Sequence, residues 1–232
     1  MKKIFFLFFT LLFGSDKIFI PGGEYVIPKG DTFYTKNFKE AKIKIKPFYI
    51  DKYEFSYDRV PKSMIHIVPI YILRSKYDIE KKLPVYTVKY EEALKICRLK
   101  GGDLPTEEQW MVAAGFEKGK FYKFPTKHYP LTQKDLKEQS QNYLQQIDNK
   151  YYLLDDYAPV NEALKGNNQI YGMLGNVWEM VKSKGKYVLV KGGSFYDFDR
   201  IDLFDIRVRN YVLKKYVPST LLIGFRCVYE KQ

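Results

Sequence analysis

The stretch from Tyr171 to Met180, YGMLGNVWEM, constrains the fold of this chain more than any other. Two glycines and an asparagine precede a tryptophan and a glutamate, and glycine costs about 1 kcal/mol relative to alanine in a helix interior. We therefore expect irregular, buried backbone, whose NH and carbonyl groups must find partners. The side chains of Asn176 and Glu179 can supply them, either directly or by holding a hard cation through oxygen ligands.

Length and ring content indicate one sizeable domain. The chain has 232 residues, which is within the single-domain range. It contains 21 Tyr and 17 Phe, so we expect a core rich in rings and some tyrosines at the surface. Exposed tyrosines make contact platforms at low entropic cost.

The first residues, MKKIFFLFFTLLFGS, predict export. Two lysines precede an apolar run that is too short to span a bilayer, as in a signal peptide. We assign 1–15 to the signal peptide and 16–232 to the domain, and expect a periplasmic or extracellular location. A buried N-terminal strand is the alternative, and removal of the signal stays open because no A-x-A cleavage pattern is present.

The formal charge of +12 favours contact with acidic surfaces. Envelope polymers, acidic glycans and anionic lipids at a membrane surface are the partners of this kind. The lysines are scattered, and no helix-turn-helix, zinc-finger or RNP pattern accompanies them. We therefore expect no nucleic-acid binding.

Short strands are predicted at both ends of the chain. Ile18 to Ile27 is a strand interrupted by a Pro-Gly-Gly turn, and Ile43 to Phe55 alternates polar and apolar residues as a strand pair would. Residues 58–82 have no clear period and read as a long insertion that contains His66. Further strands are expected at Tyr187–Val190, the GGSF segment, Ile206–Val208 and Ile223–Tyr229.

Two helices are predicted between Leu83 and Gly115. The first runs over Tyr90–Lys100 and ends before Gly101, where a left-handed cap needs no Cβ. The second opens with the capping box Thr106–Gln109, packs one side on the core and stops at Gly115. Residues 116–169 then form a long loop, which must carry function or be held by something other than a strand ladder.

Eight segments taken in chain order resemble one family. They are IPGGEY, PFYIDKYEFS, LPVYTVKYEEALKIC, LKGGDLPTEEQWMVAAG, APVNEA, NQIYGMLGNVWEM, VLVKGGSFYD and GFRC. Together they look like the formylglycine-generating enzyme, or sulfatase-modifying factor, domain, and LPTEEQW and GNVWE are the specific signals. The resemblance implies an α+β, C-type-lectin-like fold with a small twisted antiparallel sheet, two helices, much irregular loop and often bound calcium.

The resemblance also shows what this chain lacks. Family members that oxidise a substrate cysteine use two cysteines between the GGS segment and the final GFR, whereas Ser194 to Arg226 contains none, and the side chains around Phe198 and Leu203 are hydrocarbon. We therefore expect no sulfatase-activating oxidase activity and no copper. Superfamily members that bind iron do so through three histidines, and only His66 and His128 exist here, so no iron is expected.

The two cysteines of the chain stand where some family members have a structural disulfide. Cys97 lies in the first predicted helix and Cys227 follows GFR. A bridge between them would close a loop that stabilises by roughly 5 kcal/mol in the chain-entropy model. The alternative is two buried free thiols, and we favour the disulfide.

Calcium is the cofactor that the resemblance favours. One site would use Asn142, the Tyr143 carbonyl, Asp155 or Asp156, and the Tyr157 carbonyl. A second would use Asn176 and Glu179 with backbone oxygens, since Ca²⁺ takes hard oxygen ligands. The alternative is that these side chains bond to loop backbone without a metal.

By resemblance, a ligand groove would lie between the GGSF and GFRC segments. Its floor would be formed by Phe195, Tyr196, Asp197, Asp199, Arg207 and Arg209. Arginine can fork onto a carboxylate or sugar acid while tyrosine stacks on it. Alternating Arg-x-Arg also fits one solvated face of a strand, and we favour that interpretation slightly.

The leading hypothesis is an exported, non-catalytic binding or accessory module for a protein, a peptide or an envelope glycan. The alternatives are a cysteine-independent enzyme of the same superfamily, such as an oxidoreductase, and a structural envelope protein.

Overall fold

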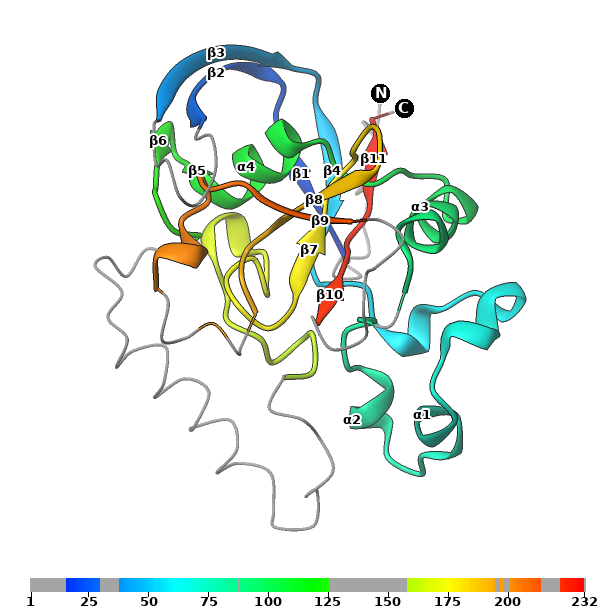
Figure 1. The fold of residues 1–232 in the computed structure, drawn as a ribbon. Helices are drawn as coiled ribbons and strands as arrows, with labels where there is room; N and C mark the ends of the chain where they lie inside the picture. The colour runs from blue at the N-terminus through cyan, green and yellow to red at the C-terminus, as the bar shows by residue number, and fades with distance from the viewer. Residues whose placement is uncertain are drawn as a thin grey trace, which may run out of the picture.

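The computed structural model describes residues 16–29, 38–86, 88–125, 158–194, 197, 201–213 and 222–231. The predicted signal peptide, 1–15, lies outside these residues. Within them the protein is a mixed α and β structure in which short helices and small sheets are joined by much irregular backbone (Figure 1).

The helices of the described residues fall into two longer and two shorter ones. Their bounds are α1 (Ile70–Arg74), α2 (Asp78–Lys81), α3 (Tyr90–Leu99) and α4 (Glu107–Gly115). The two longer helices, α3 and α4, match the sequence prediction. Gly101 has φ +78° just past α3, and Thr106 and Gln109 form the predicted capping box. The shorter helices lie in the segment 58–82, which the sequence pattern left without an assignment.

The strands form several small sheets. Their bounds are β1 (Lys17–Ile20), β2 (Gly23–Lys29), β3 (Lys39–Ile45), β4 (Phe48–Asp51), β5 (Phe116–Glu117), β6 (Lys120–Phe121), β7 (Trp178–Met180), β8 (Tyr187–Lys191), β9 (Asn210–Leu213), β10 (Ile223–Gly224) and β11 (Val228–Glu230). The sheet orders are β1-β4-β11, β10-β7-β8-β9, β2-β3 and β5-β6. All of these pairs are antiparallel except β10 with β7.

The predicted strand pairs are divided between sheets. β1 and β2 are consecutive in sequence, as are β3 and β4, yet β1 pairs with β4 and β2 pairs with β3. The strand expected at Ile206–Val208 is wrong, because that segment turns and β9 begins only at Asn210. Ile223–Tyr229 contains two short strands separated by a break.

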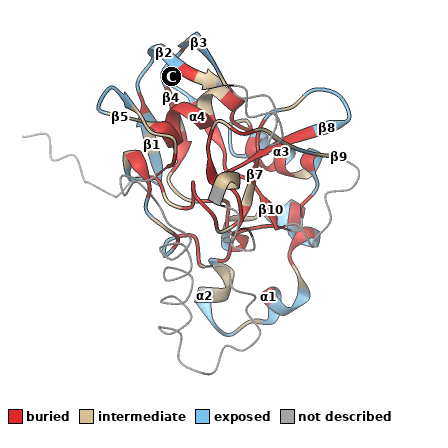
Figure 2. Ribbon diagram, turned by 60° about the vertical axis from the view of Figure 1, so that its left-hand side comes forward, coloured by how far each residue is buried: buried red, intermediate tan, exposed pale blue. Residues whose placement is uncertain are grey.

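The core surrounds α4 rather than lying along one side of it. Trp110 to Gly115 are all buried, so the predicted one-sided packing is wrong. Strands β2 and β3 cover the helix on one side, with Ile27 and Ile45 among the side chains packed there. In Figure 2 the buried colour runs through α4 and the sheets around it.

The predicted disulfide is present. Cys97 on α3 and Cys227 between β10 and β11 are bonded with their Cα atoms 5.4 Å apart, and both are fully buried. The bridge therefore joins α3 to the segment before β11, near the end of the chain. The two cysteines are 130 residues apart in sequence.

An apolar surface patch lies on the segment that runs from η2 (Lys62–Ile67) to the start of α2. We call it the apolar tip, and it consists of Ile65, Ile70, Tyr71, Leu73 and Tyr77, each about half exposed or more. In α1 only Ile72 packs inward. Figures 1 and 2 show α1 and α2 at one end of the molecule, and Figure 2 shows the pale exposed colour on both. No helix of the described residues has the length and apolar character needed to cross a membrane.

We predict that removing the disulfide lowers the free energy of unfolding by about 3–5 kcal/mol, because the unfolded chain gains the freedom of a long loop. The change is Cys97→Ala together with Cys227→Ala, and the measurement is urea denaturation. Reducing agent should lower the stability of the natural protein by a similar amount and leave the variant unchanged. A variant within about 1 kcal/mol of the natural protein would contradict the prediction.

Candidate functional site

The YGMLGNVWEM segment is held by a buried ion pair between Glu179 of β7 and Arg226. Arg226 donates from Nε to Glu179 Oε2 at 2.7 Å and from a terminal nitrogen to Oε1 at 2.5 Å. The indole NH of Trp110 also donates to Oε2, at 2.8 Å. All three side chains have no exposed surface. The pair thus joins α4, β7 and the segment after β10 at the centre of the molecule.

The remaining donors of Arg226 satisfy backbone at the end of β4 and at the start of the YGMLGNVWEM segment. They reach the carbonyl oxygens of Asp51 at 3.2 Å and Tyr171 at 2.8 Å. Burial works against the charge of Arg226, but the attraction of Glu179 outweighs it and raises the pKa of Arg226 above its ordinary value. Arg226 is therefore a buried, permanent cation with a structural role.

Asn176 connects the same segment to a second buried carboxylate, Glu54. The Asn176 amide donates to Glu54 Oε2 at 2.5 Å, and the Val177 NH donates to Oε1 at 3.3 Å. Asn176 Oδ1 accepts from the Ala158 NH at 2.8 Å. Asn176 has φ +60°, and the neighbouring Gly172 has φ +70°. A Cβ on Gly172 would stand 2.5 Å from Glu54 Oε2, so only glycine fits there.

The Glu54 carboxyl group is a weaker acid than an ordinary glutamate. Full burial, and then repulsion from Glu179, raise the pKa of Glu54 well above its ordinary value, while Arg226 and the hydrogen bonds oppose this rise. Burial penalises the charged form of a carboxyl group. The Glu54 carboxyl group is therefore a buried group whose proton binds more tightly in the folded chain than in the unfolded one.

A second cluster of buried charges lies at the start of α4. Arg209 forks onto Glu107, with Nε 2.7 Å from Oε1 and a terminal nitrogen bonded to Oε2. Lys191 Nζ stands 3.5 Å from Glu107 Oε1 and donates to the Val208 carbonyl at 2.9 Å. Burial, opposed by the attraction of Glu107, lowers the pKa of Lys191 to about 8. This cluster fixes the segment before β9 against α4.

The described members of the predicted ligand groove have intramolecular partners. Arg207 forks onto Asp205, with a shortest distance of 2.7 Å, and its guanidinium stacks 3.9 Å from the centroid of Phe38. Asp197 Oδ2 accepts from the NH and the hydroxyl of Ser194. The side chains of Arg207 and Arg209 remain about one quarter exposed. Their predicted contact with a ligand stays a prediction, and Phe195, Tyr196 and Asp199 lie outside the described residues.

The two calcium predictions differ in what the structure describes. Asn142, Tyr143, Asp155, Asp156 and Tyr157 lie outside the described residues, so the first site stays a prediction.

The side-chain oxygens of the second predicted site, Asn176 and Glu179, accept hydrogen bonds from other groups of the protein, and calcium binding there stays a prediction. Both Glu179 oxygens accept from Arg226, and Asn176 Oδ1 accepts from backbone. Both side chains satisfy neighbouring backbone and side-chain groups. In the described part of the chain, no cluster of three or more His, Cys, Asp or Glu side chains is placed to hold a metal ion.

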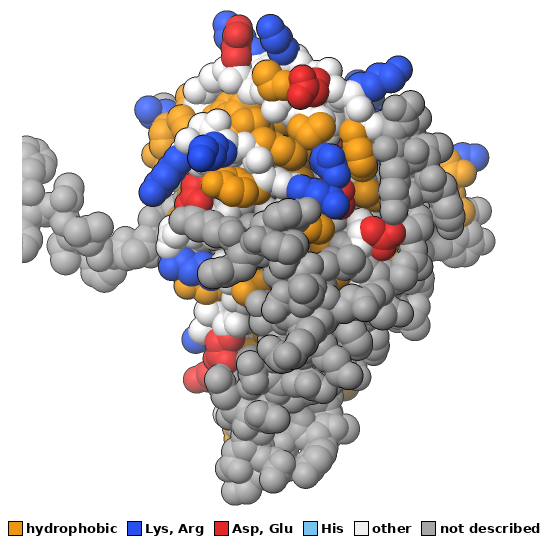
Figure 3. All heavy atoms as spheres, turned by 90° about the vertical axis from the view of Figure 1, so that its left-hand side faces the viewer, with side chains coloured by type: hydrophobic (Ala, Val, Ile, Leu, Met, Phe, Trp, Pro, Cys, Tyr) orange, Lys and Arg blue, Asp and Glu red, His pale blue; other side chains and the backbone are white. Residues whose placement is uncertain are grey.

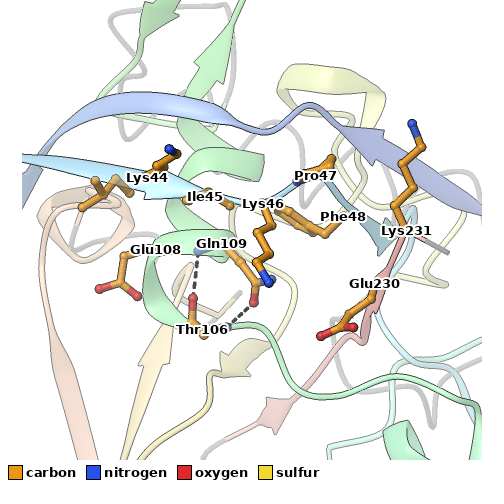
Figure 4. Close-up of a pocket in the computed structure, with 11 residues that line it drawn as sticks. Lys44, Ile45, Lys46, Pro47, Phe48, Thr106, Glu108, Gln109, Glu230 and Lys231 are labelled. Carbon is orange, nitrogen blue, oxygen red and sulfur yellow. Dashed lines mark hydrogen bonds between the residues drawn. The ribbon is translucent and has the colours of Figure 1, made fainter.

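A groove of about 730 Å³ opens beside β3 (Figure 4). One wall is the run Ile43–Phe48, the other is the start of α4, and Glu230 and Lys231 stand at one end. Its volume is within the range of roughly 300–1,000 Å³ that is usual for ligand sites. The sequence reasoning missed this groove, since it forms only where segments far apart in sequence meet.

The sequence reasoning also missed the buried charges Glu54, Glu107, Lys191 and Arg226. Each lies within or beside a segment that carried the family resemblance, and that was the available signal. Burial could not be read from the sequence, because such charges are mostly exposed and are buried only when paired.

The comparisons with known proteins agree with this architecture. The family profile described as "Sulfatase-modifying factor enzyme 1-like domain" matches residues 13–231. The Bacillus subtilis (strain 168) protein YfmG is 24% identical over 275 aligned residues, which cover 91% of this chain and 53% of that protein. The chain thus spans about half the length of this curated relative.

Two solved structures share the fold. Treponema denticola variable protein 1 superposes with a TM-score of 0.66 at 14% identity, covering 93% of this chain and 95% of that chain. The crystal structure of CarF gives a TM-score of 0.59 at 18% identity, covering 94% of this chain and 98% of that chain. At these identities the likeness shows the fold alone.

We predict that Glu179→Ala destabilises the protein by about 3–5 kcal/mol, because it leaves the Arg226 charge buried without its partner. The double variant Glu179→Leu with Arg226→Met should recover part of this loss, since it removes both charges. Urea denaturation of the natural protein and both variants measures the effect. A double variant that is less stable than the single one would contradict the prediction.

We predict that Glu54 makes stability fall as the pH rises from roughly 4.3, the pKa of an unfolded glutamate, toward the higher pKa of the folded state. In that window the folded state binds more protons than the unfolded state, so the free energy of unfolding decreases with pH. Relative to Glu54→Gln, the natural protein should lose stability across this window. The exposed Glu162→Gln is the control, and parallel profiles for natural protein and Glu54→Gln would refute the assignment.

Proposed function

This chain belongs to the sulfatase-modifying factor enzyme 1-like family, and from that premise we propose that it is an exported, non-catalytic binding module. One observation carries the proposal. The chain has two cysteines, and both are consumed in a buried disulfide. A thiolate is the nucleophile and metal ligand in cysteine chemistry. Without a free thiol, the chain has no group to bind copper or substrate as a cysteine-dependent oxidase requires.

The charged groups near the predicted groove support the same conclusion. Arg207, Arg209 and Asp197 are each engaged by a neighbouring side chain or backbone group. A residue fixed in this way can present a shaped, charged surface, which suits recognition. The disulfide is also compatible with an oxidising compartment outside the cytoplasm.

Two surface features supply places for a partner. The groove beside β3 has the volume of a ligand site, and the apolar tip is a cluster of large exposed hydrophobic side chains of the kind that marks interaction surfaces. On the face shown in Figure 3, lysine and arginine side chains stand among apolar ones rather than in one block. We propose a protein, a peptide or an acidic envelope glycan as the ligand class.

We predict no conversion of a sulfatase-type cysteine peptide to formylglycine, with or without added copper and reductant. The measurement is mass spectrometry of the peptide, with a family member that has the catalytic cysteine pair as positive control. Formation of product by this chain would refute the proposal.

The binding role is tested separately by applying the oxidised full chain to peptide and glycan arrays. We expect concentration-dependent binding to a restricted set of spots. A disulfide-free variant that no longer folds should lose this binding. Absence of any selective binding would contradict the binding role.

A further inference from the structure

Among the described residues, strand β3 has one edge that no other strand covers. It pairs with β2 in a two-stranded sheet, and within the described residues no other strand pairs with it. Figure 4 shows β3 running between β2 on one side and the start of α4 on the other, with the groove on the α4 side. The open edge of β3 therefore borders the groove.

The position of the Ile45 carbonyl oxygen indicates which edge of β3 each backbone NH and carbonyl group faces. A Cβ placed on Gly22 would lie 3.0 Å from the carbonyl oxygen of Ile45, so that oxygen faces the β2 side. Alternate residues of an antiparallel pair turn their NH and carbonyl groups to opposite edges. The NH and carbonyl groups of Lys42 and Lys44 are accordingly directed to the open edge, where they can pair with another strand.

The side chains of β3 alternate in character between its two faces. Lys42 and Lys44 are exposed on the outer face, whereas Ile43 is half-buried and Ile45 is buried on the inner one. Ile43, Ile45, Pro47 and Phe48 form the apolar part of the groove lining, and Lys44 and Lys46 of the same run line it as well. A strand added here would place alternate side chains over the lysines and the others against apolar groups, since residues opposite each other on one face are in contact.

The charges favour an acidic strand. No salt bridge to Lys42, Lys44 or Lys46 occurs within the described part of the structure, although Glu24 lies opposite Lys44 in the register with β2. Glu40 shares the outer face, and Glu108 and Glu230 stand across and at the end of the groove. Lysines thus dominate the β3 side, and like charges directly opposite each other would oppose pairing with β3 of a second copy.

We propose that the open edge of β3 pairs with an extended segment of a partner polypeptide in which acidic and apolar residues alternate. This inference rests on the proposed binding role and names the class of its ligand. The acidic side chains lie over Lys42 and Lys44, the apolar ones enter the groove beside Ile43, and backbone hydrogen bonds hold the segment along the edge.

The test is fluorescence anisotropy of labelled, end-blocked seven-residue peptides with the oxidised full chain. A peptide that alternates glutamate with valine should bind at least tenfold more tightly than one that alternates lysine with valine. The variant Lys42→Glu with Lys44→Glu should weaken binding of the acidic peptide at least tenfold and reverse the preference. The matched control, Lys95→Glu with Lys184→Glu, alters exposed lysines elsewhere and should leave it unchanged.

Backbone pairing is tested with N-methylated forms of the acidic peptide. Methylation of one set of amides, those of glutamate or those of valine, should abolish peptide binding. Methylation of the other set should leave binding unchanged, because only one set faces β3. Equal effects of the two peptides would overturn strand pairing. Equal binding of the acidic and basic peptides would overturn the choice of partner. So would a dimer of the natural chain that the Lys42 and Lys44 variant no longer forms.

Failure here is distinguishable from failure of the binding role itself. If the array gives selective ligands that the Lys42 and Lys44 variant still binds, the module binds through another surface and only the β3 inference falls. If neither the array nor the peptides show selective binding, the proposed function falls with it.

Discussion

The buried pair of Glu179 and Arg226 is the interaction on which the rest of the structure depends. Two opposite charges taken out of water are tolerable only when each is hydrogen-bonded on all sides. Here they also hold the Trp110 indole and two backbone carbonyl groups. An irregular segment with glycines in left-handed conformation has no ladder of its own to satisfy its backbone. The pair satisfies the Tyr171 carbonyl of this segment, while several of its NH groups bond to other backbone carbonyls or to Glu54.

The disulfide changes what the family scaffold can do. Sulfur that could have been reactive in another arrangement is here a fully buried link between α3 and the segment after β10. A cystine has neither a thiolate nor an exchangeable proton, so it contributes stability and no nucleophile. The proposed binding role relies on surfaces, which suits a scaffold whose loops vary over a fixed base.

The electrostatic arrangement separates structural charges from available ones. Lys191 and Arg209 each pair with Glu107, and Arg207 pairs with Asp205, and these groups fix the segments that border the predicted groove. Lysines on the outer face of β3 have no such partners among the described residues. The paired charges keep a fixed position, whereas an exposed lysine beside the β3 edge can form a new ion pair with a ligand.

Some properties of this protein could be read from its sequence. The family, the fold class, the two longer helices with their capping box and glycine stop, and the pairing of Cys97 with Cys227 follow from local rules and from motif order. Which strands pair, that α4 is enclosed, and that Glu54, Lys191 and Arg226 are buried did not follow. Those features depend on contacts between residues far apart in sequence, and only the tertiary structure decides whether a charged side chain meets a partner or water.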